Sequence, residues 1–558
     1  MKRTIYILSL LAIALCSQAK LPKFLTKARL APVSILTHDA EGNLREGQGV
    51  ILNAQGEIIT EYDLLKGAVK ATVVDANGTE YPVKYICGAS SMYNIVKLCI
   101  EPGKEKLSFL ETAQAEMPAG AIAYVLPNVK ADKKAIASED TIKSESKFRE
   151  SYHYYSLAGK VSERQVSSAV LNSEGQLIGL AQLPTKKEDE AYVIDARFGG
   201  DLQITVLNAS SADLRSIPLP KRLPEGEEAA SSFILLSGTK DTAQYLSYVA
   251  DFIRLYPNSA TGYIMKAEAL AAAGQYAESE KAYADGFAQE GTKKDELHYS
   301  LSKTIYDLTL RPSYQPYADW NIDRSVAEAA KAYEVNPLDI YRNQQAHALY
   351  VAKKYDEACK IYLDLTQTNM RTADLFLYAA LCKQKQDAPI DEIISLQDSA
   401  VNCFTKPYPA AAASAILMRG TSLALAGKNR EAVMDYNEYE HLMAGNLPAN
   451  FYYEREQLEV KCRMYPAALN DIERAIRLKP NEPLYYAECA SLNYRVGQVD
   501  EAIVHAQQAI KVAPAFADAH RILGVCFNQK GDKQKAREHL KKAVELGDQM
   551  AQSVLDKL

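Results

Sequence analysis

The chain has 558 residues, of which 47% are hydrophobic and 24% charged, and its 64 Lys and Arg against 70 Asp and Glu give a net charge of −6. This length predicts more than one domain, because single hydrophobic cores stop growing well below it. The ordinary composition excludes a disordered, collagen-like or disulfide-rich chain, and the negative net charge provides no general basic field for nucleic-acid binding.

The N-terminus has the pattern of a secretion signal. Lys2 and Arg3 precede an apolar run over residues 5–15, and residues 17–19 have the small-x-small form of a cleavage site. The run is too short for a membrane-spanning helix, which needs about 20 apolar residues. We therefore predict a signal peptide over residues 1–19 and a bacterial protein exported to the periplasm, the outer membrane or the medium.

A lipid anchor is the alternative to cleavage after Ala19. Cys16 follows the apolar run and can be acylated, but the bulky Leu15 precedes it where a small residue is usual. The mature chain would then begin at Cys16 in place of Lys20. No later segment is long and apolar enough to span a bilayer, so the sequence predicts no transmembrane segment.

From residue 20 to residue 209 the sequence predicts an all-β domain. Short runs rich in β-branched and aromatic residues alternate with turn signals such as Asn77-Gly78 and Glu174-Gly175. The expected strands cover residues 33–36, 49–52, 57–60, 71–74, 81–87, 95–100, 121–126, 169–171, 176–181 and 191–194. Many short strands at this spacing are typical of a β-sandwich or β-barrel.

The cysteines form no recognisable metal or redox motif. No Cys-x-x-Cys pair occurs, so neither a zinc ribbon nor a thioredoxin-like centre is predicted. Cys87 and Cys99 lie on two strands that are expected to pair, so they can form a disulfide in an exported protein. The other cysteines of the mature chain lie in helical stretches, mostly at apolar positions, where thiols act as small hydrophobes.

Residues 210–228 are predicted as a linker. They contain Pro218, Pro220 and Pro224, which interrupt regular secondary structure between the predicted β domain and the predicted helical part. After this segment the chain becomes rich in alanine and tyrosine and is predicted to be helical to residue 558.

The helical part repeats with a period of 34 residues. The equivalent pairs are Gly497 and Gly531, Ala502 and Ala536, Ala509 and Ala543, and Pro480 and Pro514. This period is the length of the tetratricopeptide repeat (TPR), in which each unit is a helix hairpin. Small residues let the two helices approach closely, the glycine gives the left-handed turn between them, and the proline closes the second helix.

This region resembles a TPR domain. Units that fit well begin near residues 260, 339, 413, 483 and 517, and degenerate units begin near 294, 373 and 449. In the unit near 449, Glu456 occupies a small-residue position. With a capping helix pair over 229–237 and 242–256, we predict a solenoid of about eight TPR-like units over residues 229–558, clearest at 413–550.

Three segments of the β domain have the order and spacing of a known peptidase family. Residues 47–51 and 56–68 resemble the strand pair and the T-x-x-H-V segment of bacterial trypsin-like serine peptidases. Residues 92–98 resemble the strand that carries the aspartate, and residues 166–172 and 175–179 resemble the nucleophile segment and the next strand. The resemblance implies a multidomain β + α chain, with an N-terminal trypsin-like double β-barrel followed by an all-α TPR superhelical solenoid.

The same resemblance locates the catalytic positions, and none of them holds its usual residue. The base position is Asp63, the orienting acid position is Asn94 and the nucleophile position is Val166. Arg164 replaces the glycine of the oxyanion hole. A Ser-His-Asp triad needs an imidazole to take the serine proton and a carboxylate to orient that imidazole, so we predict no enzymatic activity.

A shifted alignment does not restore the triad. A slip of one or two residues brings Ser167 or Ser168 to the nucleophile position, but it leaves no histidine at position 63. His38 and His153, the histidines of this domain, both lie away from the base position. The domain is therefore expected to be an inactive peptidase fold that serves binding or structure.

The remaining motifs predict a protein-binding surface and no cofactor or metal. No HExxH, P-loop or GxGxxG sequence occurs, and His505, His520 and His539 are expected to be packed or solvated. The TPR resemblance places the inner surface of the solenoid at Asn343, His347, Tyr350, Tyr453, Gln457, Lys461, Tyr494, Arg495, Arg521, Asn528 and Gln529. This polar and aromatic set suits an extended peptide or polar chain.

Together these features predict an exported bacterial scaffold protein. Its TPR solenoid would bind a protein or peptide partner in the cell envelope, and the trypsin-like domain would be an accessory binding module. The alternative, from a different class, is an active serine endopeptidase whose substrates are recruited by the repeats.

Overall fold

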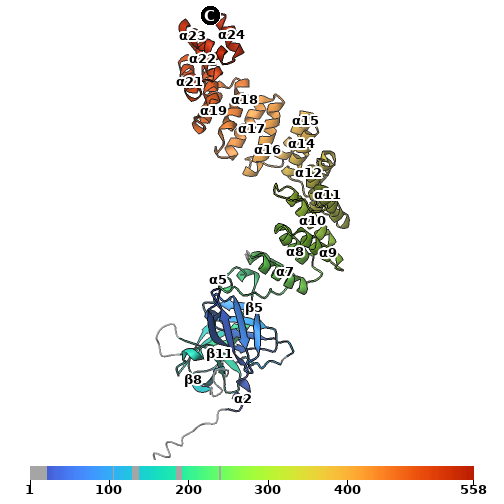
Figure 1. Ribbon diagram of the computed structural model, residues 1–558, viewed down its shortest axis with the longest axis vertical. Helices are drawn as coiled ribbons and strands as arrows, with labels where there is room; N and C mark the ends of the chain where they lie inside the picture. Colours follow the sequence, from blue (N-terminus) through green and yellow to red (C-terminus); the bar gives the residue numbers. More distant parts are fainter. Residues whose placement is uncertain (1–21, 105, 129–136, 184–190, 238–240) are drawn as a thin grey trace, which may run out of the picture. The chain divides into compact units, whose positions relative to one another are not determined.

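The computed structural model describes residues 22–558 except 105, 129–136, 184–190 and 238–240 (Figure 1). The predicted signal peptide and Cys16 therefore lie outside the described residues. The chain forms two compact units, Met1–Thr292 and Lys293–Leu558. In the described part of the chain, no helix combines the length and apolar character needed to cross a membrane.

The first unit contains two closed six-stranded antiparallel barrels, which confirm the predicted double β-barrel. The first barrel has the strand order β1-β2-β3-β6-β5-β4, with β1 (Pro32–His38), β2 (Leu44–Ile51), β3 (Glu57–Thr60), β4 (Lys70–Val74), β5 (Glu80–Ser90) and β6 (Ile95–Ile100). The second has the order β10-β11-β12-β9-β8-β7, with β7 (Ile122–Leu126), β8 (Ser138–Phe148), β9 (Tyr152–Leu157), β10 (Ala169–Leu171), β11 (Leu177–Gln182) and β12 (Ala191–Asp195). Short helical segments lie before, between and after these strands: α2 (Leu25–Ala28), α3 (Tyr62–Leu65), η1 (Glu163–Gln165), α4 (Ala196–Asp201), η2 (Val206–Asn208) and α5 (Ala212–Arg215).

Two strands, β8 and β9, have no counterpart in the predicted ranges. The strand β8 is polar and mostly exposed, and of its residues only Ile142 is buried. An alternation of apolar and polar residues is the main sequence signal of a strand, and β8 lacks it. This strand is held in place by its ladders with β7 and β9.

The two barrels are joined by a shared apolar layer. Each barrel has its own interior, and a further cluster of buried side chains spans both of them. From the first barrel this cluster includes Val50 and Ile59, and from the second it includes Leu126, Leu180 and Ile194. This shared layer holds the two barrels against one another.

The segment 210–228, which its prolines predicted to be a linker, packs on the first barrel. Ile217 and Leu219 are fully or nearly fully buried. The N–H of Ile86 donates to the carbonyl of Pro220, and the N–H of Arg222 donates to the carbonyl of Ile86. Prolines lack a donor but not an acceptor. The segment therefore pairs with Ile86 of β5 in a single parallel bridge, while its apolar side chains join the barrel core.

The helices of the first unit continue that core. They are α6 (Glu227–Leu236), α7 (Thr242–Leu255), α8 (Ala260–Ala272) and α9 (Tyr276–Ala288). Phe233 of α6, Phe252 of α7 and Met265 of α8 belong to the same buried cluster as the interior of the first barrel. The barrel and the first helices therefore fold against one another.

The second unit is helical, and its consecutive helices pack on one another (Figure 1). Its helices are α10 (Lys294–Thr309), α11 (Ile322–Val335), α12 (Asp339–Val351), α13 (Tyr355–Leu365), α14 (Ala373–Lys385), α15 (Ile390–Val401), α16 (Ala413–Leu425), α17 (Asn429–Leu442), α18 (Ala449–Lys461), α19 (Tyr465–Leu478), α20 (Pro483–Arg495), α21 (Val499–Val512), α22 (Ala517–Gln529), α23 (Lys533–Glu545) and α24 (Gln549–Leu555), with the turn η3 (Ala410–Ala412) before α16. The helices α8, α10, α12, α14, α16, α18, α20 and α22 begin where the repeat units were predicted to begin.

The packing of α22 against α23 shows why the repeat needs small residues. Ala536 is fully buried, and a Cβ atom at Gly524 would lie 2.5 Å from Cγ of Leu540. Gly497 and Gly531, which connect paired helices, have φ values of +84° and +81°. Residues with side chains rarely adopt this conformation, so these glycines set the turn.

We expect Ala536→Leu or Ala502→Leu to destabilise the solenoid by about 1–3 kcal/mol, because each adds carbon atoms to a filled helix contact. Urea unfolding followed by helical circular dichroism measures this change. Gln534→Leu, on the exposed side of α23, is the matched control and should leave stability nearly unchanged. Unchanged stability in both alanine variants would contradict the assigned repeat register.

Candidate functional site

The structure brings into contact two of the three positions that the resemblance assigns to the triad. Asp63 lies in α3 after strand β3, and Asn94 lies in the turn before β6. Oδ1 of Asn94 accepts a hydrogen bond of 2.9 Å from the backbone N–H of Asp63. The side chain of Asn94 therefore holds the backbone of Asp63 in place. Neither residue has the imidazole that a Ser-His-Asp triad uses for proton transfer.

The third position lies in a closed turn. The 3₁₀ turn η1 precedes Val166, whose N–H donates to the carbonyl of Glu163 at 3.4 Å. The N–H of Ser167 donates to Ala181 at 2.8 Å, and the N–H of Ser168 donates to Gln165 at 3.1 Å. An oxyanion hole requires N–H groups that point toward the substrate, and these three already have carbonyl partners within the protein.

The two serines beside Val166 are buried. Ser167 is 2% exposed, with φ at +61°, and Ser168 is fully buried. Gln48 of β2 lies next to them: its Oε1 is 3.4 Å from Oγ of Ser168, and its Nε2 donates to the carbonyl of Arg164. Gln48 also accepts from the N–H of Asn128 at 2.7 Å, so it ties the nucleophile loop to both barrels. A carboxamide is no base at neutral pH.

The histidines of the barrels lie elsewhere. His38 is on β1, where its Nδ1 is buried without a hydrogen-bond partner in the described residues. His153 is on β9, 5% exposed, with its Nδ1 in contact with Oε1 of Glu145. Neither ring is hydrogen-bonded to Ser167 or Ser168 in the contacts of the described residues.

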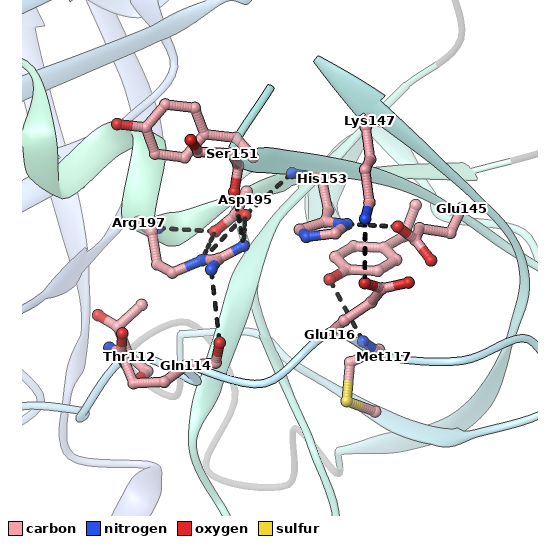
Figure 2. Close-up of polar contacts among 12 residues, drawn as sticks. Thr112, Gln114, Glu116, Met117, Glu145, Lys147, Ser151, His153, Asp195 and Arg197 are labelled. Atoms are coloured by element: carbon pink, nitrogen blue, oxygen red, sulfur yellow. Dashed lines mark hydrogen bonds and ion pairs between the residues drawn. The ribbon is translucent and has the colours of Figure 1, made fainter. Parts of the chain in front are cut away.

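Sequence reasoning missed a polar cluster on the second barrel (Figure 2). Glu145, Lys147 and His153 point toward one another from β8 and β9, and Glu116 approaches from the segment before β7. The ammonium of Lys147 is 3.4 Å from Oε2 of Glu116. The contact with Glu145 and the ammonium of Lys147 hold the pKa of Glu116 below its ordinary value.

The cluster is bonded to an ion pair between the half-buried Arg197 and the buried Asp195. The backbone N–H of His153 donates to Oδ2 of Asp195 at 3.0 Å, and Nη2 of Arg197 lies 2.6 Å from the same oxygen. Asp195 is 2% exposed. The bond to Asp195 therefore fixes the position of the histidine backbone.

Cys87 and Cys99 lie side by side on β5 and β6, as predicted, and both are buried free thiols. Cys87 sits at a bulge between Ile86 and Gly88, two residues from Tyr85, which pairs with Cys99. A hydrogen bond between the thiols raises the pKa of Cys87 and lowers that of Cys99. The disulfide between them therefore stays a prediction, which oxidation of the folded protein can test.

The predicted inner surface of the solenoid is only partly accessible. Its residues lie on the first helices of the pairs, α12, α18, α20 and α22. The exposed ones are Lys461, Arg495, Asn528 and Gln529, and the half-buried ones are Asn343, His347, Tyr350, Tyr453, Gln457, Tyr494 and Arg521. The accessible part of the predicted groove therefore lies toward the C-terminal ends of α18, α20 and α22.

Several of the half-buried residues take part in helix packing. His347 shares a hydrogen bond of 2.8 Å with the hydroxyl of Tyr362, and its ring lies 4.7 Å from that of Tyr378. Burial lowers the pKa of His347. Tyr453 packs on Tyr485 with ring centroids 5.3 Å apart. The large number of tyrosines therefore reflects repeat packing at these positions.

The helix α18 carries buried charges that the sequence did not predict. Arg455 is 4% exposed and makes a bidentate pair with Asp471 of α19 at 2.6 and 2.8 Å. Glu456 and Glu459 are 1% and 3% exposed, and Oε2 of Glu459 has no hydrogen-bond partner in the described residues. Burial raises the pKa of both glutamates to about 7.

Comparison with protein families supports both parts of the architecture. Residues 47–180 match the family described as Trypsin-like peptidase domain, and residues 489–551 match the family described as Tetratricopeptide repeat. The chain therefore contains a trypsin-like peptidase domain and a TPR region, as the two resemblances implied.

Curated proteins match the chain over short stretches. One is the Small glutamine-rich tetratricopeptide repeat-containing protein 2 of Mycosarcoma maydis, 39% identical over 82 residues, which are 15% of this chain and 23% of that protein. The TPR repeat-containing thioredoxin TTL4 of Arabidopsis thaliana is 33% identical over 76 residues, 14% of this chain and 11% of that protein. The Small glutamine-rich tetratricopeptide repeat-containing protein 2 of Saccharomyces cerevisiae is 28% identical over 91 residues, 16% of this chain and 26% of that protein. The chain thus spans about a quarter or less of each of these relatives.

Proposed function

We propose that the protein is an exported bacterial scaffold, in which the TPR solenoid binds a protein partner of the cell envelope and the trypsin-like domain is a non-catalytic binding module. The TPR family supports the first part, because stacked helix hairpins offer extended surfaces for protein partners. The N-terminal sequence pattern supports export.

The loop at residues 163–168 carries the non-catalytic part of the proposal. The N–H groups of Val166, Ser167 and Ser168 all bond to carbonyls of the protein, and the hydroxyl of Ser168 faces the amide of Gln48. Activity at either serine would require this loop to refold and a base other than the residue at position 63. A domain with these contacts is better suited to present a surface than to cleave a peptide bond.

Labelling with a fluorophosphonate probe tests this part. The full mature chain is expected to stay unlabelled under conditions that label trypsin completely, because Ser168 contacts the amide of Gln48 and neither Ser167 nor Ser168 is hydrogen-bonded to a histidine in the described part of the chain. Labelling that disappears in Ser167→Ala or Ser168→Ala would contradict the proposal and support the alternative, an endopeptidase with TPR-recruited substrates.

Cross-linking mass spectrometry of the native envelope tests the partner. Lys461 and Arg495 are exposed members of the predicted groove, so Lys461→Glu/Arg495→Glu should reduce capture of a cross-linked protein at least severalfold. Arg477→Glu, on the exposed side of the second helix α19, is the control for a charge reversal outside the groove. Equal capture by both variants would place binding outside this groove.

A further inference from the structure

We propose that Glu116, Glu145 and His153 form a binding site for a first-row divalent cation, with Zn²⁺ as the best-suited ion. Each residue offers one ligand atom, and the three atoms lie within 4.8 Å of one another. One imidazole nitrogen and two carboxylate oxygens are a ligand set that such ions accept, and three protein ligands leave one position for water. No metal site was expected from the sequence.

The strand register explains why these side chains converge. Glu145 pairs with Tyr155, and Lys147 pairs with His153, across the antiparallel strands β8 and β9. Residues that pair directly, and residues two apart on one strand, point to the same face of a sheet. Glu145, Lys147 and His153 therefore share one face (Figure 2).

The histidine is held as a ligand would be. Its ring stacks on that of Tyr155 at 5.7 Å with an angle of 13°, and its backbone is bonded to Asp195. Such support around a ligand fixes the orientation of its ring. Glu116 is exposed and can move inward, which closes the remaining distance to metal–ligand bonds of about 2 Å.

Without a metal ion, the ammonium of Lys147 offsets the negative charge of the two carboxylates. Its ammonium is 3.4 Å from Glu116, and its side chain is 59% exposed. A long exposed lysine can swing into solvent at little cost, so a divalent ion can take its place. The bound ion would tie the segment between the barrels, through Glu116, to the β8–β9 hairpin.

Zinc titration of the full mature chain against a chelating dye tests the site. Wild type is expected to bind one more equivalent of zinc than Glu145→Gln. In this variant the affinity of the site for zinc should fall at least about 100-fold, because loss of a supporting group alone lowers metal affinity about 10- to 100-fold. Glu116→Gln should weaken binding as well, whereas Lys147→Gln should strengthen it by removing the competing cation. Glu139→Gln, on an exposed part of the same strand, is the matched control.

Two further measurements separate this site from zinc held by thiols and from misfolding. X-ray absorption of the one-equivalent complex should show nitrogen and oxygen ligands, and sulfur coordination would overturn the proposal. Zinc should raise the melting temperature of wild type and not of Glu145→Gln, with equal circular dichroism of both proteins without metal. If Glu145→Gln fails to fold, the exposed Glu116→Gln decides, and wild-type affinity in that variant would also overturn the proposal.

Discussion

Replacing Arg455 with Met is expected to destabilise the solenoid by about 3–5 kcal/mol, because the change leaves the carboxylate of Asp471 buried without its partner. Arg455 and Asp471 have side chains that are 5% and 3% exposed. The guanidinium also lies 2.7 Å from Glu440 and 5.3 Å from the ring centre of Phe451. Although burial disfavours the charge, the bonds to Asp471 and Glu440 raise the pKa of Arg455 above its ordinary value.

Urea unfolding followed by helical circular dichroism measures this loss. The double variant Arg455→Met/Asp471→Leu should recover most of the stability, because it removes both charges. Lys530→Met breaks an ion pair with Asp500 in which both side chains are largely exposed, so it should change stability by less than about 1 kcal/mol. An Arg455→Met effect as small as that of Lys530→Met would show that the buried pair is not needed.

Stability of the solenoid is expected to fall as pH rises from about 4.5 to 7, owing to Glu456 and Glu459. Burial raises the pKa of each from 4.5 to about 7. Between these values the unfolded chain loses protons that the folded chain still holds, so folding becomes less favourable as pH increases. Since one pKa unit corresponds to about 1.4 kcal/mol, we expect a loss of about 3 kcal/mol for each glutamate and about 6 kcal/mol for the pair.

The variant Glu456→Gln/Glu459→Gln should lack this loss. It is expected to be about 6 kcal/mol more stable than wild type at pH 8 and to differ from it by only about 1 kcal/mol at pH 4.5, because the folded forms of both proteins are then uncharged at these positions. Glu454→Gln changes an exposed glutamate of the same helix and is the matched control. Equal pH dependence in wild type and the double variant would mean that the two glutamates are solvated in the folded protein.

The repeats and most of the strands could be predicted because their signals are local. Eight helices begin where the 34-residue period placed the repeat units, since each unit needs its own small residues and turn glycine. The peptidase resemblance was also carried by short segments, and it correctly implied two barrels. The strand β8 was missed because it buries only Ile142 and depends on its neighbours for its conformation.

The candidate sites could be predicted less well because they depend on residues far apart in the chain. The peptidase resemblance assigned Asp63 and Asn94 to triad positions, which stays a prediction, and the structure shows that these two residues touch. Nothing near Gln48 in the sequence indicates its contact with Ser168, which is 120 residues away. The groove carried over from the TPR resemblance included His347, whose ring is engaged in helix packing.

By itself, the sequence determined the order of the two folds and the repeat period, because these follow from local periodicity and short motifs. Only the tertiary structure decided which polar groups meet: Arg455 with Asp471, Glu145 with His153, and Gln48 with the loop that precedes β10. Strand register and packing between helices determine these contacts. They bring together residues that are far apart in the chain and that no local sequence pattern links.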